Sequence, residues 1–171
     1  MQETVKYTEV TEKVDTFKLM RGKEKLAFMI ASFFFVGYLP LAPGTWGSIA
    51  GFFLYYFLIP TTGIYFLPVC LLIFALGLLA SEILERFTSV HDDNKIVIDE
   101  FLGFAISVAF LPKKIVLFLA ALVIFRIFDI SKPQPIKYID EKVKGGFGVM
   151  LDDIVAGIFT NIIVRLIGIF I

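Results

Sequence analysis

The chain has 171 residues, of which 58% are hydrophobic, and its 16 basic and 16 acidic side chains give a net charge of zero. Soluble domains are only ~45–50% apolar, so the composition indicates a membrane protein, and the balanced charge argues against a nucleic-acid-binding one. Residues 26–81 contain no Asp, Glu, Lys or Arg, and a soluble domain would hardly leave 56 consecutive residues uncharged.

The first 25 residues are polar and charged, and we interpret them as an extension ahead of one membrane-embedded domain over residues 26–171. Val10, Val14 and Phe17 recur at helical spacing, which is typical of a short amphipathic helix on a membrane surface; a solvated tail is the alternative. Six Lys and Arg precede the first apolar run and place this end in the cytoplasm. No signal peptide is expected, because an apolar region would then stand near the start.

The first apolar run, residues 26–37, would be about 18 Å long as a helix. A hydrocarbon core of ~30 Å needs roughly 20 residues, so this run is predicted to be re-entrant or buried against its neighbours. In the following YLPLAPGTWGS, residues 38–48, prolines and glycines interrupt the helix and Ser48 is predicted to cap the next one. Irregular backbone at membrane depth is tolerated only inside protein or beside a wet cavity, so this loop, with Thr45, is predicted to line a site.

Two helical hairpins and a last helix are predicted next, which makes the fold class all-α: a small integral membrane helical bundle with short or re-entrant helices. The predicted helices are 49–59, 64–80, 101–111, 115–128 and 154–171. The only cysteine, Cys70, is expected to be an apolar filler, since one cysteine forms no internal disulfide or zinc cluster. Arg165 in the last helix is expected to pair or to reach the membrane surface. The long loops would share the cytoplasmic face.

Acidic side chains stand at the edges of three apolar segments. They are Asp99, Glu100, Asp129, Asp152 and Asp153. One acidic pair at a helix start is weak evidence, because the helix dipole stabilises acids there without an ion. Three such groups together favour a site for a hard cation such as magnesium. The alternative is a loop whose charges only mark the membrane boundary.

Basic side chains near these acids predict a phosphate contact, since magnesium commonly binds protein carboxylates and substrate phosphate together. Arg126, Lys132 and Lys137 are the candidates. The only histidine, His91, either joins them or is a polar loop residue. The glycines of GGFG, residues 145–148, could let backbone N–H groups approach an anion, although such loops are usually just turns.

Four motifs, in order and spacing, resemble the phosphatidylglycerophosphatase A family over about residues 35–168: GYLPLAPGTWGS, VHDDNKIVIDEFLGF, FRIFDISKPQPI and GGFGVMLDDIVAG. The resemblance implies a small helical protein of the bacterial inner membrane that crosses it several times, with its active site facing the cytoplasm. It also implies an enzyme that uses Mg²⁺ to remove the terminal phosphate of phosphatidylglycerophosphate, giving phosphatidylglycerol. Phospholipids would be its partners.

Carried over by motif, the resemblance implies metal ligands at Asp99, Glu100, Asp129, Asp152 and Asp153. It implies catalytic roles at Asp99, Asp129 and Asp153. From their chemistry we assign substrate binding to Thr45, Ser48, His91, Arg126, Lys132 and Lys137. Gln134 stands where the family's KPxPI motif is associated with tryptophan, which affects a local lipid or packing contact.

The predicted reaction is metal-assisted hydrolysis of a phosphomonoester, with one aspartate as general base. A covalent aspartyl-phosphate is the alternative route, but the chain lacks the DxDx[TV] pattern, and it also lacks SRxxxxxH and the long D-G-x-x-A-R signature. The rival from another class is a membrane transporter or scaffold whose acids form an ion path. That rival predicts charges through the membrane midplane, whereas here the acids cluster at one face.

Overall fold

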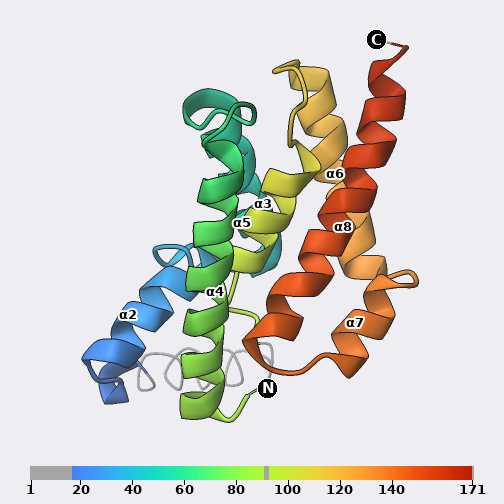
Figure 1. Cartoon of the computed structure of the whole chain (residues 1–171). Coiled ribbons are helices and arrows are strands. Elements are labelled where there is room, and N and C mark those ends of the chain that lie inside the picture. Colours follow the sequence, from blue (N-terminus) through green and yellow to red (C-terminus); the bar gives the residue numbers. More distant parts are fainter. Residues whose placement is uncertain (1–16, 91–92, 171) are drawn as a thin grey trace.

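The computed structural model describes residues 17–90 and 93–170, and this part of the chain is all-helical, as predicted (Figure 1). The elements in order are α2 (Gly22–Ala31), η1 (Val36–Tyr38), α3 (Pro43–Phe53), η2 (Leu54–Leu58), α4 (Phe66–Thr88), α5 (Ile98–Ser107), α6 (Ile115–Ser131), α7 (Ile136–Lys142) and α8 (Gly145–Gly168). Of the amphipathic helix predicted near the N-terminus, Val10 and Val14 lie outside the described residues.

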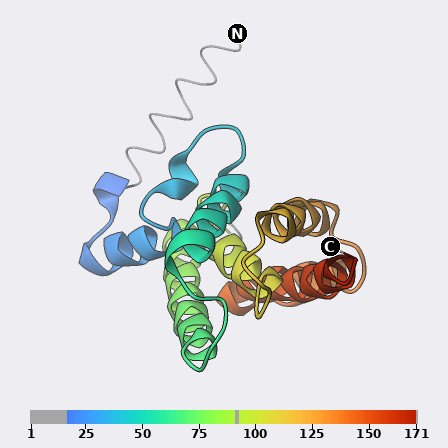
Figure 2. The ribbon, with the colours of Figure 1, turned by 90° about the horizontal axis from the view of Figure 1, so that it is seen from above.

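Helix α5 lies at the centre of the bundle and contacts α3, α4, α6 and α8 (Figures 1 and 2). Eight of its ten residues are buried, as expected for a helix that is apolar on nearly every side. Ten residues make a helix of about 15 Å, roughly half the thickness of a hydrocarbon core. Both ends of α5 are therefore enclosed by the surrounding helices.

Two glycines let α8 pack closely against α5. A Cβ on Gly157 would lie 2.4 Å from the carbonyl oxygen of Gly103, and a Cβ on Gly103 would lie 2.8 Å from the carbonyl oxygen of Asp153. Small residues allow such close approach of helices in membrane proteins. The contact holds the acidic segment of α8 beside the start of α5.

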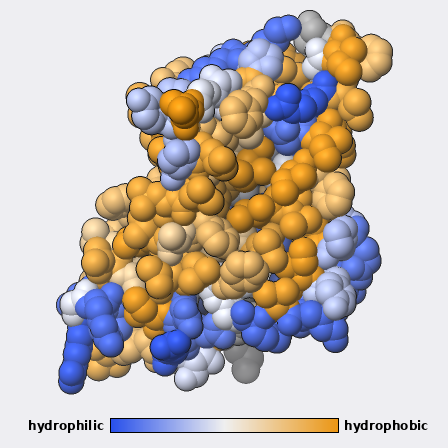
Figure 3. Space-filling view, viewed as in Figure 1, coloured by the Kyte–Doolittle hydropathy of each residue, from blue (hydrophilic) through white to orange (hydrophobic). Residues whose placement is uncertain are grey.

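Within the described residues, α4 and α8 are long and apolar enough to cross a membrane, with 23 and 24 residues. Figure 3 shows hydrophobic side chains across the middle of the visible face, with hydrophilic side chains along its lower end and a smaller group near its upper end. Many large apolar side chains on the helices are exposed, among them Leu71, Val123 and Ile162. These features suit a small helical membrane protein.

Two predicted helix boundaries in the first half of the chain were wrong. Helix α3 begins at Pro43, where proline's fixed φ suits the first helical position. Ser48 is therefore no cap; its hydroxyl donates to the carbonyl oxygen of Gly44 at 3.0 Å inside the helix. Helix α4 continues to Thr88, beyond the predicted end at residue 80.

The last helix also begins earlier than predicted, at Gly145, so Asp152 and Asp153 lie two turns inside it. The glycine-rich run is helical and packed: a Cβ on Gly146 would lie 2.3 Å from the carbonyl oxygen of Leu78 in α4. These glycines thus serve helix packing in place of the anion-binding loop considered above. The short helix α7 was not predicted at all.

Candidate functional site

A cavity of about 400 Å³ lies where the starts of α3 and α5, the end of α6 and the acidic segment of α8 meet. Its lining consists of Ala42, Pro43, Gly44, Asn94, Ile96, Asp99, Glu100, Arg126, Asp129, Ile130, Lys132, Asp152 and Asp153. The fold therefore brings all five predicted carboxylates together, although they come from three separate parts of the chain. Two of the predicted basic residues join them.

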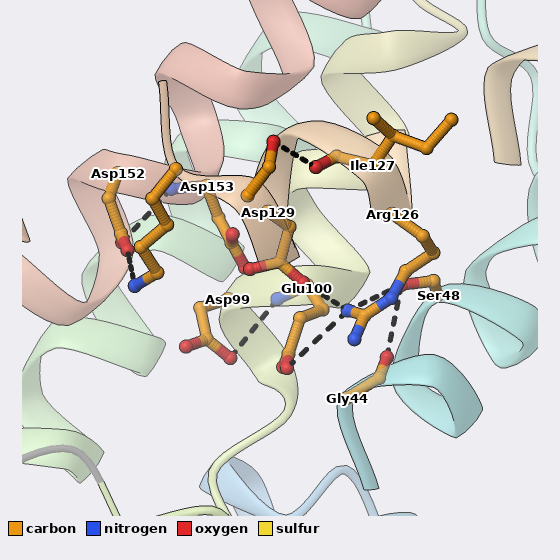
Figure 4. Close-up of polar contacts among 11 residues, drawn as sticks. Gly44, Ser48, Asp99, Glu100, Arg126, Ile127, Asp129, Asp152 and Asp153 are labelled. Atoms are coloured by element: carbon orange, nitrogen blue, oxygen red, sulfur yellow. Dashed lines mark hydrogen bonds and ion pairs between the residues drawn. The ribbon is translucent and has the colours of Figure 1, made fainter. Parts of the chain in front are cut away.

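Three carboxylates are close enough to share one cation. Asp99 and Glu100 stand in the first turn of α5, and oxygen atoms of these two and of Asp153 lie within 4.8 Å of one another (Figure 4). Asp99 and Asp153 are only 6% and 3% exposed. Buried carboxylates this close repel each other unless a cation or proton offsets the charge. The dipole of α5 favours acids at this end, and its backbone contributes a hydrogen bond from the Glu100 N–H to Asp99 Oδ1 at 3.0 Å.

Arg126 connects three helices at the edge of this acidic group. Its Nη1 pairs with Asp129 one turn further along α6, lies 3.8 Å from Glu100 Oε1, and donates to Ser48 Oγ at 3.5 Å (Figure 4). Arg126 Nε and Glu100 Oε2 are buried and have no hydrogen-bond partner in the described part of the chain. The polar groups of Arg126 and Glu100 are therefore not fully matched by each other, while the Arg126 side chain lines the cavity.

Close approach of α3 to this group depends on Gly44. A Cβ at this position would lie 1.8 Å from Glu100 Oε1 and 3.1 Å from Arg126 Nη1. A larger residue would displace the Glu100 carboxylate from its place beside Arg126. Steric crowding thus explains why a glycine stands at this position of the LAPGTWGS motif, which the sequence alone did not reveal.

Lys132 lies on the opposite side of the acids, at the end of α6, in a left-handed conformation with φ of 41°. Its Nζ donates to Asp152 Oδ2 at 2.7 Å and to Asp140 Oδ1 of α7 at 2.5 Å. Burial lowers the pKa of Lys132, but the hydrogen bonds and charges of the two carboxylates outweigh burial and raise it above its ordinary value. The ammonium group is therefore a permanent cation of the cavity wall.

The other predicted binding residues lie outside the cavity wall or outside the described residues. Thr45 is half-buried in the first turn of α3 but does not line the cavity. Lys137 is exposed on α7, with Nζ 3.8 Å from Glu141, so the structure does not bring it to the acids. His91 lies outside the described residues.

Four residues of the site or its support were missed, and one of them, Ile96, lines the cavity. Asn94 and Ile130 also line the cavity, and Asp140 binds Lys132. Asp140 could have been found only by recognising that residues 136–142 form a helix, which carries it back toward the end of α6. Ile130 directly follows Asp129, and an apolar side chain there had no visible signal.

The fold and the cavity together define an all-helical protein of membrane type with an acidic, base-flanked site, the arrangement expected of a metal-assisted phosphatase. The family model described as Phosphatidylglycerophosphatase A matches residues 29–168, and the chain belongs to this family. The resemblance seen in the motifs is thereby confirmed, as is the prediction that the chain is an enzyme.

Curated relatives agree with this membership. The chain is 43% identical over 138 residues to Phosphatidylglycerophosphatase A of Haemophilus influenzae, covering 80% of this chain and 85% of the relative. It is 38% identical over 141 residues to Phosphatidylglycerophosphatase A of Escherichia coli, covering 82% of each. It is also 34% identical over 154 residues to a Putative phosphatidylinositol-3-phosphatase of Bacteroides thetaiotaomicron, covering 85% of this chain and 95% of the relative. No solved structure matches.

Proposed function

We propose that this chain hydrolyses the terminal phosphomonoester of phosphatidylglycerophosphate to give phosphatidylglycerol and phosphate. The substrate is inferred from the names of its relatives. The observation that carries the proposal is the convergence of five carboxylates with Arg126 and Lys132 in one cavity. Acids suit a divalent cation and the two bases suit phosphate oxygens.

Magnesium fits the acidic group. Asp99, Glu100 and Asp153 offer hard oxygen ligands within reach of a single ion, and their mutual repulsion would be relieved by it. Asp152, held by Lys132 next to Asp153, would hold further water ligands. When bound, magnesium would neutralise charge on the phosphoryl oxygens and increase the acidity of a coordinated water.

The remaining polar residues divide the chemistry between them. Arg126 and Lys132 bind the phosphate oxygens from opposite sides. Asp129, outside the closest group of three carboxylates, accepts a proton from the attacking water. The water oxygen bonds to phosphorus, the bond from phosphorus to the glycerol oxygen breaks, and the leaving oxygen takes up a proton. One water is consumed for each phosphate released.

The same proposal places the chain in the bacterial cell membrane, crossing it several times, with the cavity facing the cytoplasm. Its support is the distribution of basic residues. Among the described Lys and Arg, Lys113 and Lys114 stand in the connection between α5 and α6 and Arg165 in the last turn of α8, segments that lie at the end of the bundle away from α7 (Figure 1). Basic residues prefer the cytoplasmic side.

The test uses full-length protein purified in detergent. Phosphate release from phosphatidylglycerophosphate should require magnesium and stop on chelation. As a readout besides activity, magnesium should raise the melting temperature of the wild type, because a ligand that binds only the folded state stabilises it, but not that of Asp153→Asn. Failure to release phosphate from any lipid phosphomonoester would contradict the proposal and favour the transporter or scaffold.

A further inference from the structure

The loop that enters the cavity wall presents a leucine in an unusual way. Leu41 has φ of 80°, in the left-handed region that leucine rarely adopts, and its side chain is fully exposed. A bulky residue held in this region is strained, and such strain persists only where the surrounding structure enforces it. Because the exposed side chain of Leu41 gains nothing from packing, we look for a functional role for this conformation.

Neighbouring residues hold this loop in place. The indole Nε1 of Trp46 donates to the carbonyl oxygen of Pro40 at 3.1 Å. On the other side, Ala42 leads directly into Pro43, the first residue of α3, whose ring restricts the residue before it. The residues on both sides of Leu41 are thus held in place, so its position does not depend on contacts of its own side chain.

Ile130 is exposed in a comparable way on the facing helix. It directly follows Asp129, lines the cavity, and is still 73% exposed. Ala42 and Pro43 supply further apolar lining, and α3 and α6 contact each other. Ile130 belongs to the wall of the cavity, and Leu41 directly precedes the lining residue Ala42. We call these two exposed side chains the apolar rim.

The size of the cavity limits what can enter it. At about 400 Å³ it is near the lower end of the ~300–1,000 Å³ that hold drug-sized ligands. It can hold a phosphorylated headgroup but not two acyl chains in addition. A lipid whose phosphate reaches the acids must therefore leave its ester groups and chains outside, at the rim.

We propose that Leu41 and Ile130 contact the ester groups and first acyl carbons of the lipid substrate, and so determine the preference for lipid over water-soluble phosphomonoesters. This inference rests on the proposed function. Exposed apolar side chains are common over the helices of this protein, so exposure alone is no argument. Leu41 and Ile130 differ from the other exposed apolar residues in two ways. Leu41 has a strained backbone next to a lining residue, and Ile130 belongs to the cavity wall. Trp46 adds support, since tryptophan prefers the membrane–water interface.

The kinetic test compares two substrates: phosphatidylglycerophosphate in mixed micelles and glycerol 3-phosphate in solution. Leu41→Gly removes the side chain and relieves the positive φ, so the fold should be kept; Ile130→Ser removes the second contact. Each should lower kcat/KM for the lipid about ten-fold, the loss expected for one large apolar contact. Leu41→Gly should change kcat/KM for glycerol 3-phosphate less than two-fold, and Ile130→Ser should lower it less than it lowers that for the lipid. Leu71→Ser and Ile162→Ser, at exposed positions away from the cavity, should change neither.

A second measurement does not depend on activity. Trp46 is the only tryptophan, so its fluorescence reports on this loop alone. In vesicles of phosphatidylglycerol and phosphatidylcholine with brominated acyl chains, Trp46 should be quenched, and less so in Leu41→Gly.

The inference is overturned if quenching comes only from a water-soluble quencher, or if the rim variants lose activity on both substrates equally or on neither. If the wild type hydrolyses neither substrate, the proposed function fails, while the quenching result still decides whether the rim contacts lipid.

Discussion

The two ends of α5 both face polar side chains of α8, yet the two groups have opposite properties. At the C-terminal end, Asn161 donates to the carbonyl oxygens of Ser107 and Ala109 at 2.9 and 3.0 Å. Arg165 donates to the carbonyl oxygen of Ala109 at 2.8 Å and to Asn161 Oδ1 at 2.7 Å. These carbonyl groups belong to the last residue of α5 and to the segment just after it, where intrahelical partners are lacking, so the side chains complete the hydrogen bonding of the fold.

At the N-terminal end the balance is different. Five carboxylates line the cavity against only Arg126 and Lys132, and Arg126 Nε has no partner in the described residues. Polar groups at the first end are matched by groups of the same chain, whereas those at the second have an excess of negative charge. The comparison teaches that the C-terminal cluster stabilises the fold and that the N-terminal cluster is arranged for a ligand.

The largest effect should follow from neutralising the acidic group. Asp153→Asn should lower phosphatase activity by at least ~100-fold, since a catalytic carboxylate contributes about 10²–10⁴. Without metal, the melting temperature should stay the same or rise, because one of several neighbouring negative charges is removed. Activity and thermal unfolding in the same detergent test both parts. A stable variant with full activity would show that Asp153 belongs only to the fold.

Arg126→Lys should have the next largest effect. Lysine keeps the charge but loses the planar group whose Nη1 meets Asp129 and Glu100 and whose other donors are proposed to bind phosphate. Hydrogen bonds to charged groups contribute ~1.5–3 kcal/mol, so activity should fall about 10- to 100-fold in steady-state assays with magnesium. Unchanged activity would mean that the guanidinium only links the helices.

At the opposite end of α5, Asn161→Leu should lower stability and leave activity nearly unchanged, the reverse of the two variants above. Two carbonyl oxygens lose a donor, and a buried unsatisfied group costs ~1–3 kcal/mol, so the free energy of unfolding should fall by about that amount. Below the melting temperature, activity should stay within two-fold. A large loss of activity in the folded variant would break the distinction between the two ends.

The smallest effect is expected at the α7 contact. Asp140→Asn removes one partner of Lys132 but leaves Asp152 in place, so activity should fall only about two- to five-fold, as for the weaker ion-pair contributions. Lys137→Gln on the same helix, exposed and away from the cavity, is the control and should have no effect.

The pH dependence of this contact follows from the raised pKa of Lys132. Its contribution to stability is fully present below the unfolded value of ~10.4 and is lost only as the pH rises through the higher folded value. The ratio of wild-type to Asp140→Asn activity should therefore be constant between about pH 6 and pH 9. A change within that window would indicate another titrating group.

The sequence by itself determined the class and most of the chemistry. The uncharged stretch over residues 26–81 requires an apolar surrounding, and carboxylates beside apolar segments require a cation or a polar cavity. Acidic residues at three separate segment edges favoured a common site over a loop that only marks the membrane boundary, and the structure brings Asp99, Asp129 and Asp153 into one cavity. Residue type carries this information directly, because the cost of placing charge in an apolar surrounding does not depend on how the helices pack.

Only the tertiary structure decided where the helices begin and which residues reach the cavity. Helix α8 starts at Gly145, and its second residue, Gly146, packs against α4, a contact between residues far apart in the sequence. The same is true of the choice between Lys137 and Asp140 on α7: the helix turns one side chain to solvent and the other to Lys132. Such choices depend on the packing of distant segments, which local propensity and charge pattern do not contain.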